Sequence, residues 1–322
     1  MIVDLPGTTT SKISKALVRI REEGGAVALG RVLTLVIATE LGHEEEAIEA
    51  ANDASREHPM RVIVLSGAAG AAREQADARL DAQIRVGGDA GASEVIVLKA
   101  YGAMVAEEEG LVTGLLLPDA PVVAWWPGAA PASASRSALG AMAARRITDA
   151  ATQSNPREFL NHLADSYAPG DTDFSWTRLT LWRAQLAAVL DQPPYEPITS
   201  IEVRGASDSP STTLLAAWLQ LQLQVPTTCL RAPASIGGPG IHGVTLVRAS
   251  GVVDLSRPAG TIATLQQPNQ PVHDISLPRR NLRDCLAEEL RRLDPDDLYG
   301  EVIQNGVTQL DDEPDMMERN AL

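Results

Sequence analysis

The sequence is short of several reactive residue types, and each shortage excludes a class of chemistry. Among its basic residues only Lys12, Lys15 and Lys99 are lysines, which removes most candidates for a Schiff base or a phosphate-loop lysine. Cysteine is limited to Cys229 and Cys285, which lie far apart and form no paired motif. We therefore expect two buried thiols in a reducing compartment, with no disulfide framework.

Long hydrophobic runs are also missing. The most apolar stretches, residues 26–38 and 111–126, are interrupted by Arg31 and by the Pro-Asp-Ala-Pro segment at 118–121. Neither stretch is suited to span a bilayer. Residues 1–6 lack a basic region followed by an apolar stretch, so no signal peptide is predicted. We expect a cytoplasmic protein that does not contact a membrane.

Positive charge is scarce as well. The chain has 27 Lys and Arg residues against 42 Asp and Glu residues, which gives a net charge of -15. Such an acidic surface repels nucleic-acid phosphates and anionic lipid, so nucleic acid is not expected as a partner. With 322 residues, 44% of them hydrophobic and 21% charged, the composition is that of a globular protein with two domains.

Short apolar runs and helical stretches alternate through the first half of the chain. A helix is predicted at residues 8–23, because Ile13, Ala16, Leu17 and Ile20 recur at helical spacing. Buried strands are expected at residues 26–39, 61–67, 82–86, 94–98 and 121–126, and a second helix at 44–57. Buried strands separated by helices indicate an α/β sheet with helices on its faces.

The alternation continues on both sides of a turn-rich break at residues 168–171. Before it, Asn155 and Glu158 have the spacing of a capping box at a helix start. After it, residues 175–191 predict a helix with one apolar stripe, formed by Trp176, Leu179, Trp182, Leu186 and Leu190. Later elements are a strand at 198–204, a helix at 209–224, three strands between 243 and 267, a helix at 278–293 and a last helix capped by Asp294 and Pro295.

These elements predict an α/β protein of two domains, each with a mixed or mainly parallel sheet flanked by helices. The boundary is placed near residue 169, so the N-terminal domain is residues 1–169 and the C-terminal domain is residues 170–306. Residues 307–322 form the end of the chain, which is acidic and lacks periodicity. This composition predicts a disordered tail.

Catalytic signatures are missing at their required spacings. The glycines that follow residues 66 and 86 lack the dinucleotide-binding pattern, and no glycine-rich loop ends in Lys-Ser or Lys-Thr. The five histidines are scattered along the chain, which does not favour a metal site. The stretch 235–243 is compatible with an anion-binding nest of backbone amides or with a flexible connection. We therefore expect no enzyme activity, no cofactor and no metal in this chain.

Tryptophan and arginine stand out instead. Aromatic residues make up 3% of the chain, yet five residues are tryptophan. Trp125 and Trp126 are adjacent at the end of a predicted strand, where successive side chains point to opposite faces. A second group combines large apolar anchors with guanidinium groups, the residue types enriched at interface hot spots: Trp176, Arg178, Trp182 and Arg183. The alternative interpretation is an amphipathic core helix with solvated arginines.

These residues lie in segments that resemble the OpcA family, the glucose-6-phosphate dehydrogenase assembly proteins of actinobacteria and cyanobacteria. Residues 21–37, 47–59 and 121–128 are similar to actinobacterial members and cover most of the first domain. The resemblance extends through the second domain at residues 145–150, 176–183 and 293–302. It is nearly full length, and the tryptophan–arginine motif at 176–183 is specific.

The resemblance implies a non-catalytic partner that promotes assembly or allosteric activation of glucose-6-phosphate dehydrogenase, and so controls NADPH supply through the oxidative pentose phosphate pathway. The candidate partner-binding residues are Trp125, Trp126, Arg145, Arg146, Trp176, Arg178, Trp182 and Arg183. Relatives usually have proline where this chain has Leu181, so here we expect the helix to continue through that point. Cyanobacterial members are linked to thioredoxin control, but both cysteines lie outside the shared motifs, so redox regulation is not expected.

Two alternatives remain open. Arg145, Arg146, Arg178 and Arg183 are also suited to bidentate phosphate binding, which would make the chain a sugar-phosphate sensor or enzyme. A purely structural chaperone would be absent from the final complex, and dehydrogenase activity would then persist after the chain is removed.

Overall fold

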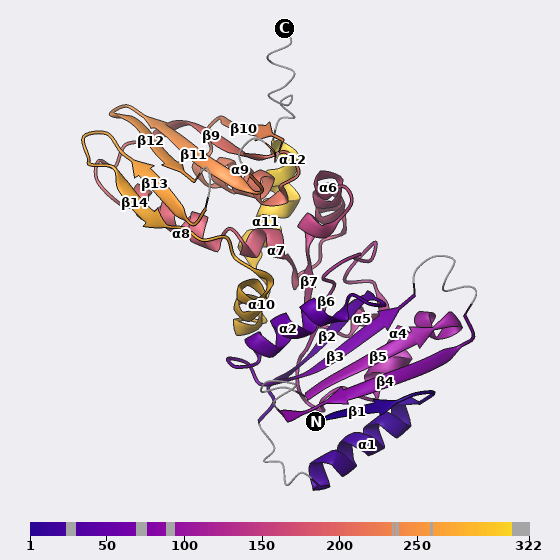
Figure 1. Cartoon of the computed structure of the whole chain (residues 1–322). Coiled ribbons are helices and arrows are strands. Elements are labelled where there is room, and N and C mark those ends of the chain that lie inside the picture. The colour runs from indigo at the N-terminus through magenta and orange to yellow at the C-terminus, as the bar shows by residue number, and fades with distance from the viewer. Residues whose placement is uncertain are drawn as a thin grey trace. The chain divides into compact units, whose positions relative to one another are not determined.

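The computed structural model describes residues 1–23, 30–68, 76–87, 94–233, 235, 238–257 and 260–310. These residues divide into two units, each with its own sheet and its own hydrophobic core. Unit 1 consists of Met1–Asp149, Gly170–Thr172 and Asn281–Pro295. Unit 2 consists of Ala150–Pro169, Asp173–Arg280 and the described residues from Asp296 onward. Figure 1 shows the elements of both units.

Unit 1 contains an eight-stranded sheet and the helices that cover it. The strands are β1 (Ile2–Leu5), β2 (Leu33–Glu40), β3 (Met60–Gly67), β4 (Arg79–Arg85), β5 (Glu94–Tyr101), β6 (Val122–Trp125), β7 (Arg145–Thr148) and β8 (Asp171–Asp173), which runs into unit 2 at its last residue. The helices are α1 (Thr10–Glu23), α2 (Glu44–Ala54), α4 (Glu108–Thr113), α5 (Ala138–Ala141) and α10 (Leu282–Arg291), with a 3-10 helix at Gly102–Ala106.

The sheet of unit 1 has the order β1-β4-β5-β3-β2-β6-β7-β8. Strands β5, β3, β2, β6 and β7 are parallel to their neighbours in this order. Strand β4 pairs with β5 in antiparallel fashion, and β1 pairs with β4 in the same way. The parallel strands are buried over most of their length, as expected where helices cover a sheet on both faces. Helix α1 packs on one face through Ile13, Leu17 and Ile20. Helix α2 contacts β2 and β3, and α10 packs against α2.

A buried carboxylate lies at the first residue of β5. Glu94 is 1% exposed and accepts hydrogen bonds from Arg61 Nε at 2.8 Å and from Arg21 Nη2 at 3.0 Å. Arg31 Nη2 lies 3.5 Å from the same carboxylate. Burial raises the pKa of Glu94, but Arg61 and the other guanidinium groups outweigh burial, so the net pKa lies below its ordinary value. This cluster of charges holds α1 against β3 and β5.

Unit 2 contains a six-stranded sheet and a second set of helices. The strands are β9 (Ile198–Ala206), β10 (Thr227–Ala232), β11 (Ile241–Arg248), β12 (Gly251–Ser256), β13 (Ile262–Gln266) and β14 (His273–Ser276). The helices are α6 (Pro156–Ser166), α7 (Phe174–Thr177), α8 (Thr180–Leu190), α9 (Pro210–Leu223), α11 (Asp297–Glu301) and α12 (Val307–Gln309), with a 3-10 helix at Ala150–Thr152 and a π-helical turn at Val302–Gly306.

The sheet of unit 2 is mixed, with the order β10-β9-β11-β12-β13-β14. Strands β9 and β10 are parallel. Strand β11 pairs with β9 in antiparallel fashion, and β12, β13 and β14 each pair in the same way with the strand before them. Helix α9 connects the parallel pair, so β9, α9 and β10 form a βαβ unit. Residues Pro210 to Ala217 of α9 are buried, because the helix packs on β9, on β10 and on the π-helical turn. Ser209 caps the start of α9 by accepting a hydrogen bond from Thr212 N at 3.2 Å.

The predicted fold class is confirmed, since both units combine a mixed sheet with flanking helices. The predicted helix at 175–191 is wrong as a single element: it forms α7 and α8, with Arg178 and Leu179 in a turn between them. The Asp173 side chain starts α7 by accepting a hydrogen bond from Ser175 N at 2.8 Å. Helix α8 begins at Thr180, so Leu181 is its second residue, and the predicted continuation of one helix through this point is wrong.

Several boundaries of the chain differ from the predicted ones. The predicted domains are continuous in sequence, whereas each unit includes short segments from elsewhere in the chain, such as Asn281–Pro295 in unit 1. Asp296 rather than Asp294 caps α11, by accepting a hydrogen bond from Tyr299 N at 3.0 Å. Val307–Gln309, predicted as part of the tail, form α12. The rest of the predicted tail, from residue 311, lies outside the described residues.

The predicted burial of both thiols is confirmed, since Cys229 is 5% and Cys285 0% exposed. Burial raises the pKa of the Cys229 thiol. Across the described ranges, every helix is too short or too polar to cross a bilayer.

Candidate functional site

The four predicted tryptophans are buried in the cores of their own units. Trp125 and Trp126, at the end of β6 in unit 1, are 0% and 5% exposed. Trp176 and Trp182, on α7 and α8 of unit 2, are 1% and 2% exposed. Trp176 Nε1 donates a hydrogen bond to Asp296 Oδ2 at 2.9 Å. Core packing in the unit is therefore the role that the structure shows for each ring.

Arg145 and Arg146 occupy adjacent positions on β7 and are ion-paired inside unit 1. Arg145 Nε donates a hydrogen bond to Glu289 Oε2 on α10 at 2.8 Å. Arg146 forms an ion pair with Asp171 on β8, and its Nη1 donates to the carbonyl oxygen of Ala143 at 2.8 Å. Both guanidinium groups are buried, so these two pairs attach α10 and β8 to the edge of the sheet.

Arg178 and Arg183 differ from the other predicted residues because they are only half-buried. The Arg183 guanidinium lies 3.9 Å from the centroid of the Trp176 ring, in cation–π geometry. The Arg178 guanidinium lies 6.0 Å from the Phe174 ring centroid. These two arginines retain exposed surface with which a partner can make contact.

The predicted residues are divided between the two units. Four belong to unit 1 and four to unit 2. The sensor alternative combines Arg145 and Arg146 of unit 1 with Arg178 and Arg183 of unit 2, so neither unit holds this set as one cluster. That these eight residues contact a partner stays a prediction. Six of them are buried, so they would act by supporting a contact surface.

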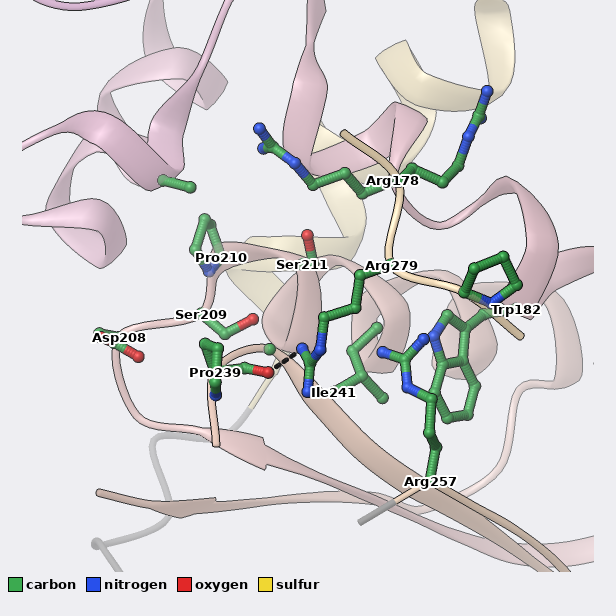
Figure 2. Close-up of a pocket in the computed structure, with 14 residues that line it drawn as sticks. Arg178, Trp182, Asp208, Ser209, Pro210, Ser211, Pro239, Ile241, Arg257 and Arg279 are labelled. Carbon is green, nitrogen blue, oxygen red and sulfur yellow. Dashed lines mark hydrogen bonds between the residues drawn. The ribbon is translucent and has the colours of Figure 1, made fainter. Parts of the chain in front are cut away.

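A pocket in unit 2 brings Arg178 together with Arg257, Arg279 and Arg280. It has a volume of about 290 Å³ and lies where α9 begins. Its lining residues are Ala151, Arg178, Trp182, Asp208, Ser209, Pro210, Ser211, Pro239, Gly240, Ile241, Arg257, Pro278, Arg279 and Arg280. Figure 2 shows the Arg257 guanidinium beside the Trp182 ring, Arg279 beside Pro239, and Ser209 and Pro210 across from Arg279.

The sequence builds this pocket from a tight turn between β9 and α9. Gly205, next to the end of β9, lies so close to α9 that an added Cβ would overlap the Thr212 side chain, with Cγ2 at 2.8 Å. Beyond the turn, Ser209 caps α9 and Pro210 occupies its first position. At this helix start, Ser209 N donates to the carbonyl oxygen of Ala206, Pro210 has no amide hydrogen, and Thr212 N donates to Ser209. The amide of Ser211 is therefore the first-turn donor that remains for another acceptor. This arrangement places a helix N-terminus at the carboxyl end of a strand.

Arg257 carries the most buried charge of the pocket. Arg257 comes directly after β12 in the chain and is 3% exposed. Its guanidinium lies 5.2 Å from the Trp182 ring centroid. Within the described part of the chain it donates a hydrogen bond to the carbonyl oxygen of Leu277, its Nε has no acceptor, and no carboxylate forms an ion pair with it. Burial first, and then the nearby charge of Arg279, lower the pKa of Arg257 to about 10. The group therefore stays protonated at neutral pH.

The remaining arginines approach from the segment that follows β14. Arg279 donates to the carbonyl oxygen of Pro239, and burial lowers its pKa as well. Arg280 Nη1 donates to the carbonyl oxygen of Thr177 at 3.0 Å. The pocket also has one carboxylate among its lining residues, Asp208, which is exposed. Positive charge therefore dominates the lining.

Sequence reasoning found a small part of this pocket. Of the candidate residues, Arg178 and Trp182 line it, and the stretch 235–243 contributes Pro239, Gly240 and Ile241. Residues 234, 236 and 237 of that region lie outside the described residues. Arg257, Arg279 and Arg280 were missed, because they belong to no motif and approach α9 only through the fold. Within the described ranges, His, Cys, Asp and Glu side chains do not gather in a group that would hold a metal ion.

The fold and the pocket define a two-sheet α/β protein with an arginine-lined cavity in its second unit. Sequence comparison is more specific. A family model described as the N-terminal domain of a glucose-6-phosphate dehydrogenase subunit matches residues 51–165, and one described as the C-terminal domain matches residues 169–303. The chain belongs to this family, OpcA. No curated protein sequence matches the chain.

Solved structures give weaker similarities. An oxidoreductase from Sinorhizobium meliloti is 11% identical with a TM-score of 0.45, over 86% of this chain and 94% of that one. An oxidoreductase from Pseudomonas syringae is 10% identical with a TM-score of 0.36, over 88% of this chain and 90% of that one. At these TM-scores the likeness carries no argument about activity.

Proposed function

We propose that this chain is a cytoplasmic, non-catalytic protein that promotes assembly of glucose-6-phosphate dehydrogenase or activates it allosterically. The observation that carries the proposal is the pair of family models, since both are described as domains of a glucose-6-phosphate dehydrogenase subunit and together they span residues 51–165 and 169–303. The proposed consequence is control of NADPH supply in the oxidative pentose phosphate pathway.

Mass action supplies the mechanism. A partner that binds the active oligomer of the dehydrogenase more tightly than its inactive forms shifts the equilibrium toward the active oligomer. A difference of about 1.4 kcal/mol between these affinities gives a tenfold shift. The chain needs no reacting group of its own for this effect.

The experiment measures the response of purified dehydrogenase to glucose 6-phosphate with and without the purified chain. We expect the chain to raise the rate or to lower the half-saturating substrate concentration, and to coelute with the dehydrogenase in gel filtration. Removal of the chain by affinity depletion then separates the two modes: persisting activity indicates assembly, and lost activity indicates allosteric activation. An unchanged substrate response without coelution, or dehydrogenase turnover by the isolated chain, would contradict the proposal.

The half-buried arginine on α8 gives the sharpest test of the contact surface. We expect Arg183→Ala to weaken dehydrogenase binding about tenfold, which corresponds to the loss of an ordinary interface contact of 1–2 kcal/mol. Arg19→Ala is the matched control, because Arg19 is an exposed arginine on α1 of unit 1. Thermal unfolding of each variant reports the separate cost of losing the contact between Arg183 and Trp176. Equal dehydrogenase binding by both variants would remove Arg183 from the contact surface.

A further inference from the structure

The arginine-lined pocket of unit 2 is not explained by binding of a dehydrogenase. We propose that this pocket binds a phosphate monoester of a small organic molecule, with the phosphate held by Arg257, Arg279 and the first turn of α9. This inference concerns the chain on its own and does not depend on the proposed function.

The first support is the state of Arg257. A buried charge is costly unless it is paired and hydrogen-bonded. Arg257 is 3% exposed, yet within the described residues its hydrogen bond goes to a neutral carbonyl, and its Nε has no acceptor. The charge that acts on it is the like charge of Arg279. An anion bound between these two guanidinium groups would supply the missing acceptor and relieve their repulsion.

The second support is the position of the pocket in the βαβ unit. Ser209, Pro210 and Ser211 line the pocket, so the N-terminus of α9 faces it. In open α/β sheets, ligands bind outside the carboxyl ends of the strands, and helix N-termini there bind phosphate through amide groups and the helix dipole. The first turn of α9 contains no acidic residue that would neutralise this end of the helix.

The shape and composition of the pocket indicate the kind of anion. A phosphate monoester has three terminal oxygens and up to two charges, which suits recognition by more than one guanidinium group together with the amide of Ser211. The pocket also has apolar walls, formed by Trp182, Pro278 and Ile241, which suit the organic part of an ester. Its volume of about 290 Å³ lies near the lower end of the range for small-molecule sites, about 300–1,000 Å³. A small metabolite therefore fits better than a polymer.

The experiment is calorimetry on the isolated full-length chain, with inorganic phosphate, inorganic sulfate, glucose 6-phosphate and adenosine 5′-monophosphate as probes. Glucose and adenosine are the controls without phosphate. We expect at least one ester to bind more tightly than inorganic phosphate or sulfate, and the controls not to bind. Arg257→Gln should weaken ester binding about tenfold or more, as expected for the loss of a charge-assisted hydrogen bond.

A matched variant separates the pocket from a general effect of removing a buried arginine. Arg248 is 5% exposed, lies on β11 of the same sheet and is not part of the pocket lining. Arg248→Gln should leave ester binding unchanged. If Arg257→Gln fails to fold, Arg279→Gln replaces it, since Arg279 is exposed and its loss leaves the core intact. The proposal is overturned if no phosphate probe binds at millimolar concentration, if sulfate binds as well as every ester, or if both pocket variants bind like the wild type.

Discussion

Buried arginines are used in different ways in the two units. In unit 1, the buried Arg61, Arg145 and Arg146 each form an ion pair with a buried carboxylate. In unit 2, the buried Arg248 and Arg257 form no ion pair with a carboxylate among the described residues, and each donates to a carbonyl oxygen. An unpaired guanidinium alone therefore does not mark a ligand site. What distinguishes Arg257 is that it faces a pocket together with other arginines and a helix N-terminus.

The Glu94 cluster in unit 1 leads to a prediction about pH. We expect Glu94→Gln to lower the free energy of unfolding at pH 7 by about 3 kcal/mol, because it leaves buried guanidinium groups without their counter-charge. The pKa of Glu94 in the folded chain is lowered from its ordinary value of 4.5. Its contribution to the free energy of unfolding is therefore complete above about pH 4.5 and is lost as the pH falls through the pKa of the folded chain. Urea unfolding across this pH range should show the two proteins converging at acid pH.

The control for this prediction is Glu45→Gln. Glu45 pairs with Arg85, but its side chain is 66% exposed, so we expect a loss below about 1 kcal/mol. A difference between wild type and Glu94→Gln that stays constant down to the acid transition would show that the ionised carboxylate of Glu94 does not stabilise the fold.

At the scale of elements, the close packing of α9 on β9 depends on Gly205. We expect Gly205→Ala to destabilise the chain by about 1–3 kcal/mol, the usual cost of overpacking, because the new methyl group would overlap Thr212, which is fully buried. The same displacement of α9 should weaken binding of the phosphate ester. Urea unfolding and calorimetry on one preparation measure both effects.

Gly110→Ala is the matched control for Gly205→Ala. Gly110 lies within α4, and an added Cβ there would meet no atom within 4 Å. Alanine should stabilise such a helical position by about 0.5–1 kcal/mol. If both variants change stability by the same amount, the contact between β9 and α9 does not set the position of the helix.

The elements that could be predicted from the sequence are those with a strong local pattern. Helix α1 has a regular apolar stripe, α6 has its capping residue, and the parallel strands are short apolar runs. Strands β7 and β8 were not predicted, because Arg145 and Arg146 interrupt the apolar pattern and Asp171 lies in the turn-rich break at residues 168–171. They are buried because each arginine forms an ion pair with a carboxylate from a distant part of the chain. Periodicity cannot reveal such a pairing.

The pocket is harder to predict from the sequence than strands β7 and β8. Its residues come from Ala151 to Arg280, and no two of its arginines except Arg279 and Arg280 are adjacent in the chain. The local signals that do exist, the Ser209 cap and the glycine-rich stretch near Gly240, are common in proteins without a ligand. Their meaning depends on the antiparallel pairing of β11 with β9, which brings Gly240 beside the start of α9. That pairing is a property of the fold.

At the scale of the whole molecule, the chain has a net charge of -15, whereas the lining of the pocket is positive. The long-range field of an acidic protein opposes the approach of any anion, and the opposition grows with the charge of the ligand. A small ester carries at most two negative charges and can be enclosed by the pocket. A nucleic acid carries a charge on each phosphate and must remain largely outside, against the acidic surface.

We therefore expect the chain to bind a phosphate ester but not duplex DNA. Fluorescence anisotropy with a labelled duplex at low ionic strength is the strictest measurement, because electrostatic attraction to DNA is strongest there. We expect no saturable binding, and no competition by the duplex for the ester in calorimetry. Saturable duplex binding that is lost in Arg257→Gln but kept in Arg248→Gln would instead make the pocket part of a nucleic-acid surface, because the local charge of the arginines would then outweigh the acidic surface around them.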